Sequence, residues 1–101
     1  METYYVYILQ SQFNDSFYKG STDNLFRRFK EHNDGKEKST CRYVPWDLVW
    51  YTEKATRPEA LILEKKLKNL SVKRTIEFIS KYPVQNVMGV LTLARVRQSG
   101  C

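Results

Sequence analysis

The sequence predicts an α+β fold, with a small, three-stranded and mainly antiparallel sheet flanked by about three helices. The chain has 101 residues, enough for one domain that buries about two thirds of its surface on folding. Short apolar runs with two-residue alternation indicate strands, and longer runs with apolar positions three or four apart indicate helices. We assign residues 3–82 to this domain and residues 83–101 to a partly disordered C-terminal extension.

Three segments have the composition of strands. Residues 3–10 place apolar or aromatic side chains on both faces, which is typical of a central strand that is covered on both sides. Residues 17–20 form a second strand, and the Asn14-Asp15 turn before it predicts a β-hairpin. Residues 46–52 are rich in large apolar side chains and are expected to form the third strand.

The first helix is expected over residues 24–33. Thr22 or Asp23 can serve as its N-cap, because their side-chain oxygens accept hydrogen bonds from the first backbone N–H groups of a helix. Gly35 is expected to provide the left-handed backbone conformation at its end.

Two more helices are expected in the second half of the domain. Pro58 suits the first turn of a helix over residues 59–70, since proline lacks the N–H that this turn leaves unbonded. Ser71 can cap a third helix, whose apolar residues recur at helical spacing and which Pro83 ends.

The charge balance favours a polyanionic partner. The chain has a formal net charge of +6 and a sequence pI of about 9.4. Most of the positive charge lies in residues 19–46 and 65–81. Such a field attracts nucleic acid, and a basic surface that is merely solvated is the alternative.

Two classes of function are disfavoured. The longest nearly apolar run, residues 87–94, is far shorter than the roughly 20 residues that cross a bilayer, and we therefore expect a cytoplasmic protein. A single histidine and two widely separated cysteines give none of the usual zinc-binding spacings.

Helical spacing distinguishes two neighbouring arginines in the first helix. Arg28 and His32 border the apolar stripe of this helix. Arg27 points away from the stripe, and its expected partner is Glu31, one turn later. Arg28 and His32 are therefore candidates for a site at the edge of the core.

Glu64 lies within the apolar arc of the second predicted helix, where a carboxylate needs a partner. Lys68, one turn later, can form an ion pair with it. Alternatively, the carboxylate holds Mg²⁺, a hard cation that takes one or two carboxylates and completes its shell with water and phosphate oxygens. Spacing alone leaves both interpretations open.

Two tyrosines on adjacent predicted strands, Tyr7 and Tyr18, are by themselves most simply core aromatics. Their surroundings, however, resemble the GIY-YIG nuclease family, in particular the small single-domain members related to the N-terminal nuclease domain of the excision-repair endonuclease. The resemblance rests on the order and spacing of motifs over roughly residues 3–80. It is carried by Tyr5-Val6-Tyr7-Ile8-Leu9, Tyr18-Lys19-Gly20 and Asn24-Leu25-Phe26-Arg27-Arg28-Phe29-Lys30-Glu31-His32-Asn33.

This resemblance implies a Mg²⁺- or Mn²⁺-dependent endonuclease that hydrolyses phosphodiester bonds in DNA, with RNA as a further candidate substrate. It implies structure-selective or weakly sequence-specific cleavage and a role in DNA repair. Tyr7 or Tyr18 would act as or assist the general base, and nearby cations would have to lower a phenol pKa that is ordinarily near 10. Arg28 would bind the phosphate, His32 would relay a proton or hold the phosphate or the tyrosine, and Glu64 would bind the metal.

The chain departs from the family pattern at three points. The glycine of the first motif and the isoleucine of the second are replaced, by Tyr5 and Lys19, and a later active-site asparagine has no clear counterpart. The alternative hypothesis is therefore a non-catalytic nucleic-acid-binding module on the same fold. A weaker alternative is an adaptor that binds an acidic protein through residues 65–81.

Basic side chains around the expected site are candidates for contacts with phosphates, and solvated surface lysines and arginines are the alternative. These nucleic-acid-binding candidates are Lys19, Arg42, Lys65, Lys66 and Lys68.

Overall fold

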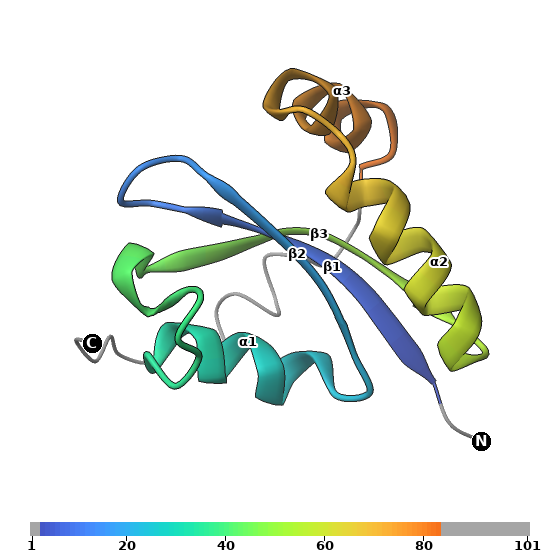
Figure 1. The fold of residues 1–101 in the computed structure, drawn as a ribbon, viewed down its shortest axis with the longest axis horizontal. Coiled ribbons are helices and arrows are strands. Elements are labelled where there is room, and N and C mark those ends of the chain that lie inside the picture. The colour runs from blue at the N-terminus through green and yellow to red at the C-terminus, as the bar shows by residue number, and fades with distance from the viewer. Residues whose placement is uncertain (1–2, 84–101) are drawn as a thin grey trace.

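A computed structural model describes residues 3–83 of the chain (Figure 1). The number and kind of its elements confirm the predicted α+β class. In chain order they are β1 (Tyr4–Ser11), β2 (Phe17–Thr22), α1 (Leu25–Asn33), a short 3-10 helix (Cys41–Tyr43), β3 (Trp46–Lys54), α2 (Arg57–Lys68) and α3 (Val72–Lys81).

The sheet has the strand order β2-β1-β3, and both pairings are antiparallel. β1 is therefore the central strand, as its two apolar faces predict. In this register Tyr7 lies opposite Gly20 on β2 and opposite Tyr51 on β3. The pairing of β1 with β2 is the predicted hairpin, and Asp15 in its turn adopts a φ of 64°.

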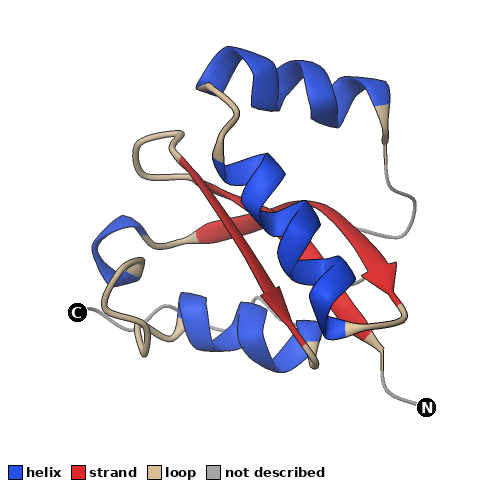
Figure 2. Ribbon diagram, turned by 45° about the vertical axis from the view of Figure 1, so that its right-hand side comes forward, coloured by secondary structure: helices blue, strands red, loops and turns tan. Residues whose placement is uncertain are grey.

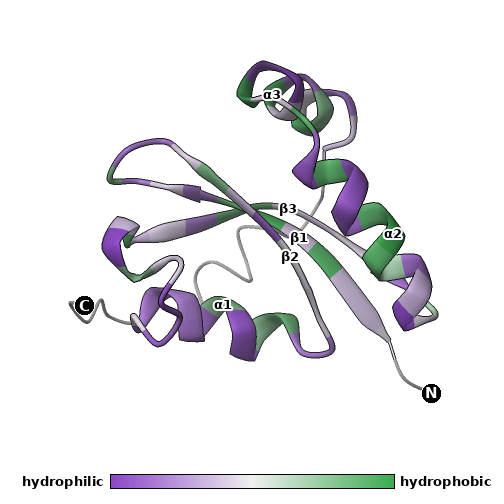
Figure 3. Cartoon of the chain, viewed as in Figure 1, coloured by the Kyte–Doolittle hydropathy of each residue, from purple (hydrophilic) through white to green (hydrophobic). Residues whose placement is uncertain are grey.

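Each face of the sheet has its own hydrophobic core. One core lies between the sheet and α1 and includes Tyr7 and Phe29. The other lies between the sheet and the pair α2 and α3, and it includes Ile8 and Leu67. Figures 1 and 2 show the helices on the two sides of the sheet. In Figure 3 the helices alternate between hydrophobic and hydrophilic colours, as expected where one side of a helix is buried.

The N-cap of α1 is Asn24, so the prediction of Thr22 or Asp23 was wrong. Asn24 Oδ1 accepts a hydrogen bond from the Arg27 N–H at 3.0 Å. The Thr22 hydroxyl oxygen instead accepts from the Asn24 N–H, at 3.1 Å, and thus stabilises the turn before the cap. The predicted end of the helix is confirmed, because Gly35 has a φ of 75°.

The later elements differ from prediction mainly at their ends. α2 starts and ends two residues earlier than the predicted range 59–70. It starts earlier because the Thr56 side chain caps it by accepting a hydrogen bond from the Glu59 N–H. Pro58 lies in its first turn, as predicted. β3 extends beyond the predicted residue 52 to Lys54. Ser71 caps α3 as predicted.

The predicted extension, residues 83–101, lies outside the described residues apart from Pro83. Within residues 3–83, no helix combines the length and the apolar character needed to cross a membrane.

Asn33, the last residue of α1, joins this helix to the start of β3. Its Oδ1 accepts from the Trp46 N–H at 2.6 Å, and its Nδ2 donates to the Trp46 carbonyl at 3.0 Å. Both residues are buried, and one amide side chain thus satisfies two backbone groups that water cannot reach.

Replacing Asn33 with alanine is therefore expected to lower the free energy of unfolding by roughly 2–4 kcal/mol, because two buried backbone groups lose their partner. Lys30→Ala, which removes a partly exposed ion pair with Asp34, is the control and is expected to cost about 1 kcal/mol or less. Urea unfolding measures both. Equal costs for the two variants would contradict this role of Asn33.

Candidate active site

The site is built around the phenol of Tyr7, which lies over Gly20 on the neighbouring strand. A Cβ atom at position 20 would lie 2.6 Å from Tyr7 Oη and 2.8 Å from Tyr7 Cζ. These distances are shorter than any van der Waals contact, so only glycine leaves room for the phenol. Gly20 therefore allows Tyr7 to lie across the sheet toward α1.

Tyr7 is buried, with 1% of its surface exposed, and its hydroxyl group meets two residues of α1. The Oη atom lies 3.0 Å from His32 Nε2. The Arg28 guanidinium lies near enough to the phenol to act on its pKa. Burial, and to a lesser extent the neighbouring Tyr18 and Glu64, raise the pKa of Tyr7 above its ordinary value, although Arg28 opposes this shift. The phenol is therefore protonated at neutral pH.

His32 is fully buried at the centre of the site. Its Nδ1 atom lies 2.8 Å from the Thr40 hydroxyl oxygen, and its ring centroid lies 4.8 Å from that of Tyr18. Burial, reinforced by the positive charge of Arg28, lowers the pKa of His32 to about 4. The imidazole is consequently neutral at physiological pH, and one of its nitrogens is a proton acceptor.

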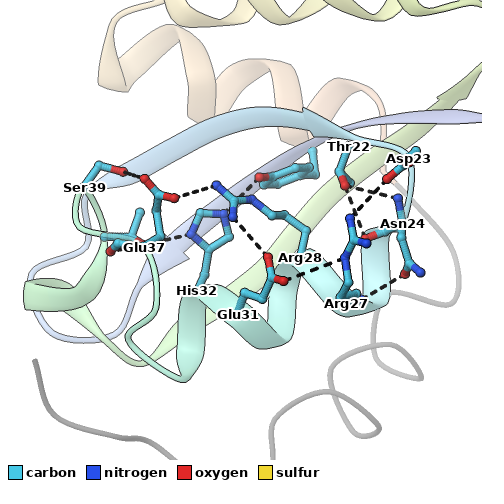
Figure 4. A network of polar contacts seen from close by, with 11 residues as sticks. Thr22, Asp23, Asn24, Arg27, Arg28, Glu31, His32, Glu37 and Ser39 are labelled. Atoms are coloured by element: carbon cyan, nitrogen blue, oxygen red, sulfur yellow. Dashed lines mark hydrogen bonds and ion pairs between the residues drawn. The ribbon is translucent and has the colours of Figure 1, made fainter.

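Arg28 carries the fixed positive charge of the site. Its two terminal nitrogens donate to Glu31 at 3.1 Å and to Glu37 at 2.8 Å (Figure 4). Partial burial by itself would lower the pKa of Arg28, but the hydrogen bonds with Glu37 and Glu31 raise it above the ordinary value. The Arg28 side chain is 26% exposed, so part of it can be reached by a ligand.

Arg27 lies outside the site, as the helical spacing predicts. Its side chain is 56% exposed and pairs with Asp23 at 3.2 Å and more distantly with Glu31 at 3.8 Å (Figure 4). The expected partner Glu31 is therefore shared, and its closer contact is with Arg28.

Tyr18 is half-buried and packs its ring against His32 and Trp46, with centroid distances of 4.8 Å and 6.4 Å. Its ring centroid lies 6.3 Å from that of Tyr7. Within residues 3–83, no side chain or backbone group forms a hydrogen bond with the Tyr18 hydroxyl. Of the two phenols, Tyr18 is thus the more exposed, because Tyr7 is buried and its hydroxyl contacts His32.

Glu64 approaches the edge strand β2 from α2. Its carboxylate accepts hydrogen bonds from the Ser21 hydroxyl and from the Lys68 ammonium group, the latter at 2.6 Å. The ion pair with Lys68 that the spacing allows is therefore formed, and it raises the pKa of Lys68. The Glu64 side chain is 16% exposed. Ser21 is a second partner that the sequence-based prediction missed.

As a metal ligand, the Glu64 carboxylate would suit a hard cation that keeps most of its own water molecules. Among residues 3–83 no cluster of three or more histidine, cysteine or acidic side chains is placed to hold a metal ion. A single carboxylate fits Mg²⁺ or Mn²⁺ that completes its shell with water and phosphate oxygens, and it does not fit a site enclosed by protein ligands. The metal would compete with Lys68 for the carboxylate.

Some of the five basic nucleic-acid-binding candidates form hydrogen bonds or ion pairs within the protein, and others lie at exposed surface positions. Lys19 donates to the Leu70 carbonyl at 3.5 Å, and partial burial lowers its pKa. Lys68 pairs with Glu64. The remaining candidates have exposed side chains and are Arg42, Lys65 and Lys66.

The structure thus brings Tyr7, Tyr18, Arg28 and His32 into one connected cluster. Glu64 lies on the other side of β2, where it acts on the Tyr7 phenol through its charge. The sequence-based prediction missed several of their partners, and these are Ser21, Glu31, Glu37 and Thr40.

The imidazole of His32 is expected to titrate near pH 4 instead of the ordinary 6.5. Between these values the unfolded chain binds a proton that the folded chain does not, so stability falls as the pH is lowered through this window. His32 alone is expected to contribute roughly 3 kcal/mol to this loss. Because the chain has one histidine, its NMR titration needs no assignment by mutation. A midpoint above 6 would contradict this account.

Gly20→Ala is expected to destabilise the fold by roughly 1–3 kcal/mol, because the new methyl group overlaps the Tyr7 phenol. In a Tyr7→Phe background the same change is expected to cost less, since the nearest atom, Oη, is gone although Cζ remains. Unfolding of the four proteins of this double-mutant cycle measures the coupling. Equal costs in both backgrounds would show that the overlap does not constrain the site.

Comparisons with known proteins agree with this arrangement. Residues 3–77 match the model of the GIY-YIG catalytic domain. A UPF0213 protein of Bacillus licheniformis is 37% identical over 84 residues, which cover 80% of this chain and 86% of the relative. The UPF0213 protein YazA of Bacillus subtilis is 34% identical over 84 residues, which cover 80% of this chain and 84% of YazA.

A solved structure is also similar. The solution NMR structure of a UPF0213 protein from Bacillus halodurans superimposes with a TM-score of 0.55 at 28% sequence identity, covering 96% of this chain and 99% of that one. The likeness thus extends over nearly the whole length of both chains. With the domain match over residues 3–77, it follows that the chain belongs to the GIY-YIG family and resembles its small UPF0213 members.

Proposed function

We propose that this protein is a metal-dependent endonuclease that hydrolyses phosphodiester bonds in DNA with structure-selective or weakly sequence-specific action. The observation that carries the proposal is the contact of the Tyr7 hydroxyl with His32 Nε2 beside the Arg28 guanidinium. A neutral proton acceptor, a phenol and a permanent cation are thereby close together, beside a second, half-buried phenol, Tyr18. The net charge of +6 supports a nucleic-acid substrate.

Arg28 is proposed to bind the scissile phosphate. Its guanidinium now donates to two carboxylates, and phosphate oxygens accept from the same donor groups with similar geometry. A phosphate would replace one carboxylate, and Glu37 is the more readily displaced because it lies in the loop after α1, whereas Glu31 is part of the helix. The positive charge then stabilises the negative charge that develops on the phosphate oxygens during attack.

Tyr7 and His32 are proposed to accept the proton of the attacking water, which the Tyr18 hydroxyl orients. The buried Tyr7 oxygen would take a proton from a water molecule that enters the site with the substrate, while its own proton passes to His32 Nε2 over 3.0 Å. This transfer requires no free phenolate, whose formation the raised pKa of Tyr7 disfavours. The resulting hydroxide attacks phosphorus, and the proton on His32 returns through Tyr7 to solvent or to the leaving oxygen.

Glu64 is the residue proposed to hold Mg²⁺ or Mn²⁺. When bound, such an ion polarises the phosphate and stabilises the leaving oxygen. Ser21 would keep the carboxylate in place at the edge of β2, and Lys68 would release it to the metal. We propose the cytoplasm as the location and DNA repair as the process.

A second candidate function is a non-catalytic nucleic-acid-binding module. It is favoured by the engagement of Arg28 with two carboxylates and of Glu64 with Lys68, since these contacts compensate the charges that catalysis would use. Salt-sensitive DNA binding without cleavage in Mg²⁺ or Mn²⁺ would select this function.

Glu64→Gln and Arg28→Lys are each expected to reduce metal-dependent cleavage roughly 100-fold or more, because the first removes the metal-binding charge and the second removes the planar donor pair. Glu77→Gln and Arg27→Lys are matched controls at exposed positions and are expected to cleave like the unmodified protein. Cleavage of nicked, branched and single-stranded DNA is measured with Mg²⁺, Mn²⁺ or EDTA.

Thermal unfolding of the same variants shows whether each one is folded. Cleavage that is undiminished in both Glu64→Gln and Arg28→Lys would rule out the proposed endonuclease site.

A further inference from the structure

Thr40 is a buried residue of the site, and the proposed cleavage mechanism gives it no role. It lies in the loop between α1 and β3, and none of its surface is exposed. Its hydroxyl oxygen lies 2.8 Å from His32 Nδ1. Its backbone is held in place, because its N–H donates to the Glu37 carbonyl at 3.1 Å and its carbonyl accepts from the Trp46 indole at 2.9 Å. The hydroxyl is therefore presented to the imidazole by a fixed backbone.

The number of protons on each group shows which partner donates in the hydrogen bonds between Tyr7, His32 and Thr40. The buried Tyr7 hydroxyl needs an acceptor, and of its two polar neighbours Arg28 can only donate. The acceptor is therefore His32 Nε2, which must carry a lone pair. Because the imidazole is neutral, its one N–H is then at Nδ1 and donates to the Thr40 oxygen.

The remaining proton completes the same chain. The Thr40 hydroxyl donates to the Glu37 carbonyl, which lies 3.4 Å away. Tyr7 thus donates to His32, His32 to Thr40, and Thr40 to the Glu37 carbonyl. The opposite direction would leave the Tyr7 hydroxyl proton without an acceptor in a buried site, at a large cost. The carboxylate of Glu37 closes the network by accepting from Arg28.

We propose that Thr40 is a positioning residue that holds His32 in the tautomer protonated at Nδ1, so that Nε2 is the proton acceptor facing Tyr7. Which nitrogen of a histidine is protonated depends on the hydrogen bond that the other nitrogen makes, and the Thr40 hydroxyl provides that bond. The tautomer follows from the contacts alone, whereas its effect on cleavage rests on the proposed function.

The tautomer is measured directly by NMR of the protein labelled with ¹⁵N at histidine. The chain has one histidine, so both ring nitrogens are identified from their couplings to the ring protons. Measured at pH 7, the unmodified protein is expected to show a protonated Nδ1 and an unprotonated Nε2. Thr40→Ser keeps the hydroxyl and is expected to give the same spectrum. Thr40→Val removes the acceptor of the Nδ1 proton at similar volume, so a buried N–H loses its partner in the Nδ1–H tautomer, and part of the population is expected to shift to Nε2–H at the expense of the bond from the Tyr7 hydroxyl.

An unmodified protein that is protonated at Nε2 would overturn the proposal, as would Thr40→Val with the unchanged Nδ1–H tautomer. If Thr40→Val fails to fold, Thr40→Ala takes its place, because the smaller side chain puts no additional methyl group against Nδ1. The spectrum of the unmodified protein decides the assignment in either case.

Cleavage kinetics provide the second readout. Thr40→Val is expected to lower kcat at least 10-fold with little change in KM, and Thr40→Ser is expected to restore kcat. If the unmodified protein cleaves no DNA, the proposed function fails while the NMR result still decides the tautomer. If it cleaves and Thr40→Val has the shifted tautomer but an unchanged kcat, the positioning role is refuted and the endonuclease activity is not.

Discussion

The antiparallel register between β1 and β2 is the constraint on which the site depends. It sets Tyr7 opposite Gly20, and the missing side chain at that position lets the phenol extend toward α1. Arg28 and His32, which lie one helical turn apart on α1, then meet the same hydroxyl group. A slip of one residue would turn Tyr7 into the opposite core. Correct strand pairing and assembly of the site are therefore a single requirement.

Burial divides the site into two electrostatic regions. Its inner part holds Tyr7 and His32, whose pKa values are shifted so that both stay neutral at physiological pH. Its outer part holds Arg28, whose charge is balanced by the carboxylates of Glu31 and Glu37. In the proposed function, proton exchange and phosphate binding therefore fall to different groups that share one hydrogen-bonded network. Such a division lets the phenol and imidazole exchange a proton without a stable buried charge in the resting protein.

The parts of the structure that follow from local periodicity could be predicted from the sequence. The central strand was recognisable from its two apolar faces, and helical spacing distinguished Arg28 from Arg27. The N-cap of α1 could not be predicted from the sequence. Thr22, Asp23 and Asn24 are all good caps, and the hairpin geometry decides among them. Long-range partners were also missed: Ser21 meets Glu64 across 43 residues, and Thr40 lies in a loop without periodicity. Such contacts depend on how the sheet and helices pack, which no short segment encodes.

The central claim is that the phenols, the guanidinium, the imidazole and the carboxylate of Glu64 serve one divalent ion and one phosphate. The most direct measurement is the anomalous scattering of Mn²⁺ in crystals of the Tyr7→Phe variant grown with a short branched DNA. The account predicts one Mn²⁺ beside the Glu64 carboxylate, with Lys68 displaced and a DNA phosphate in contact with Arg28. DNA bound on another face, or Glu64 still paired with Lys68 and no Mn²⁺ beside it, would contradict the account.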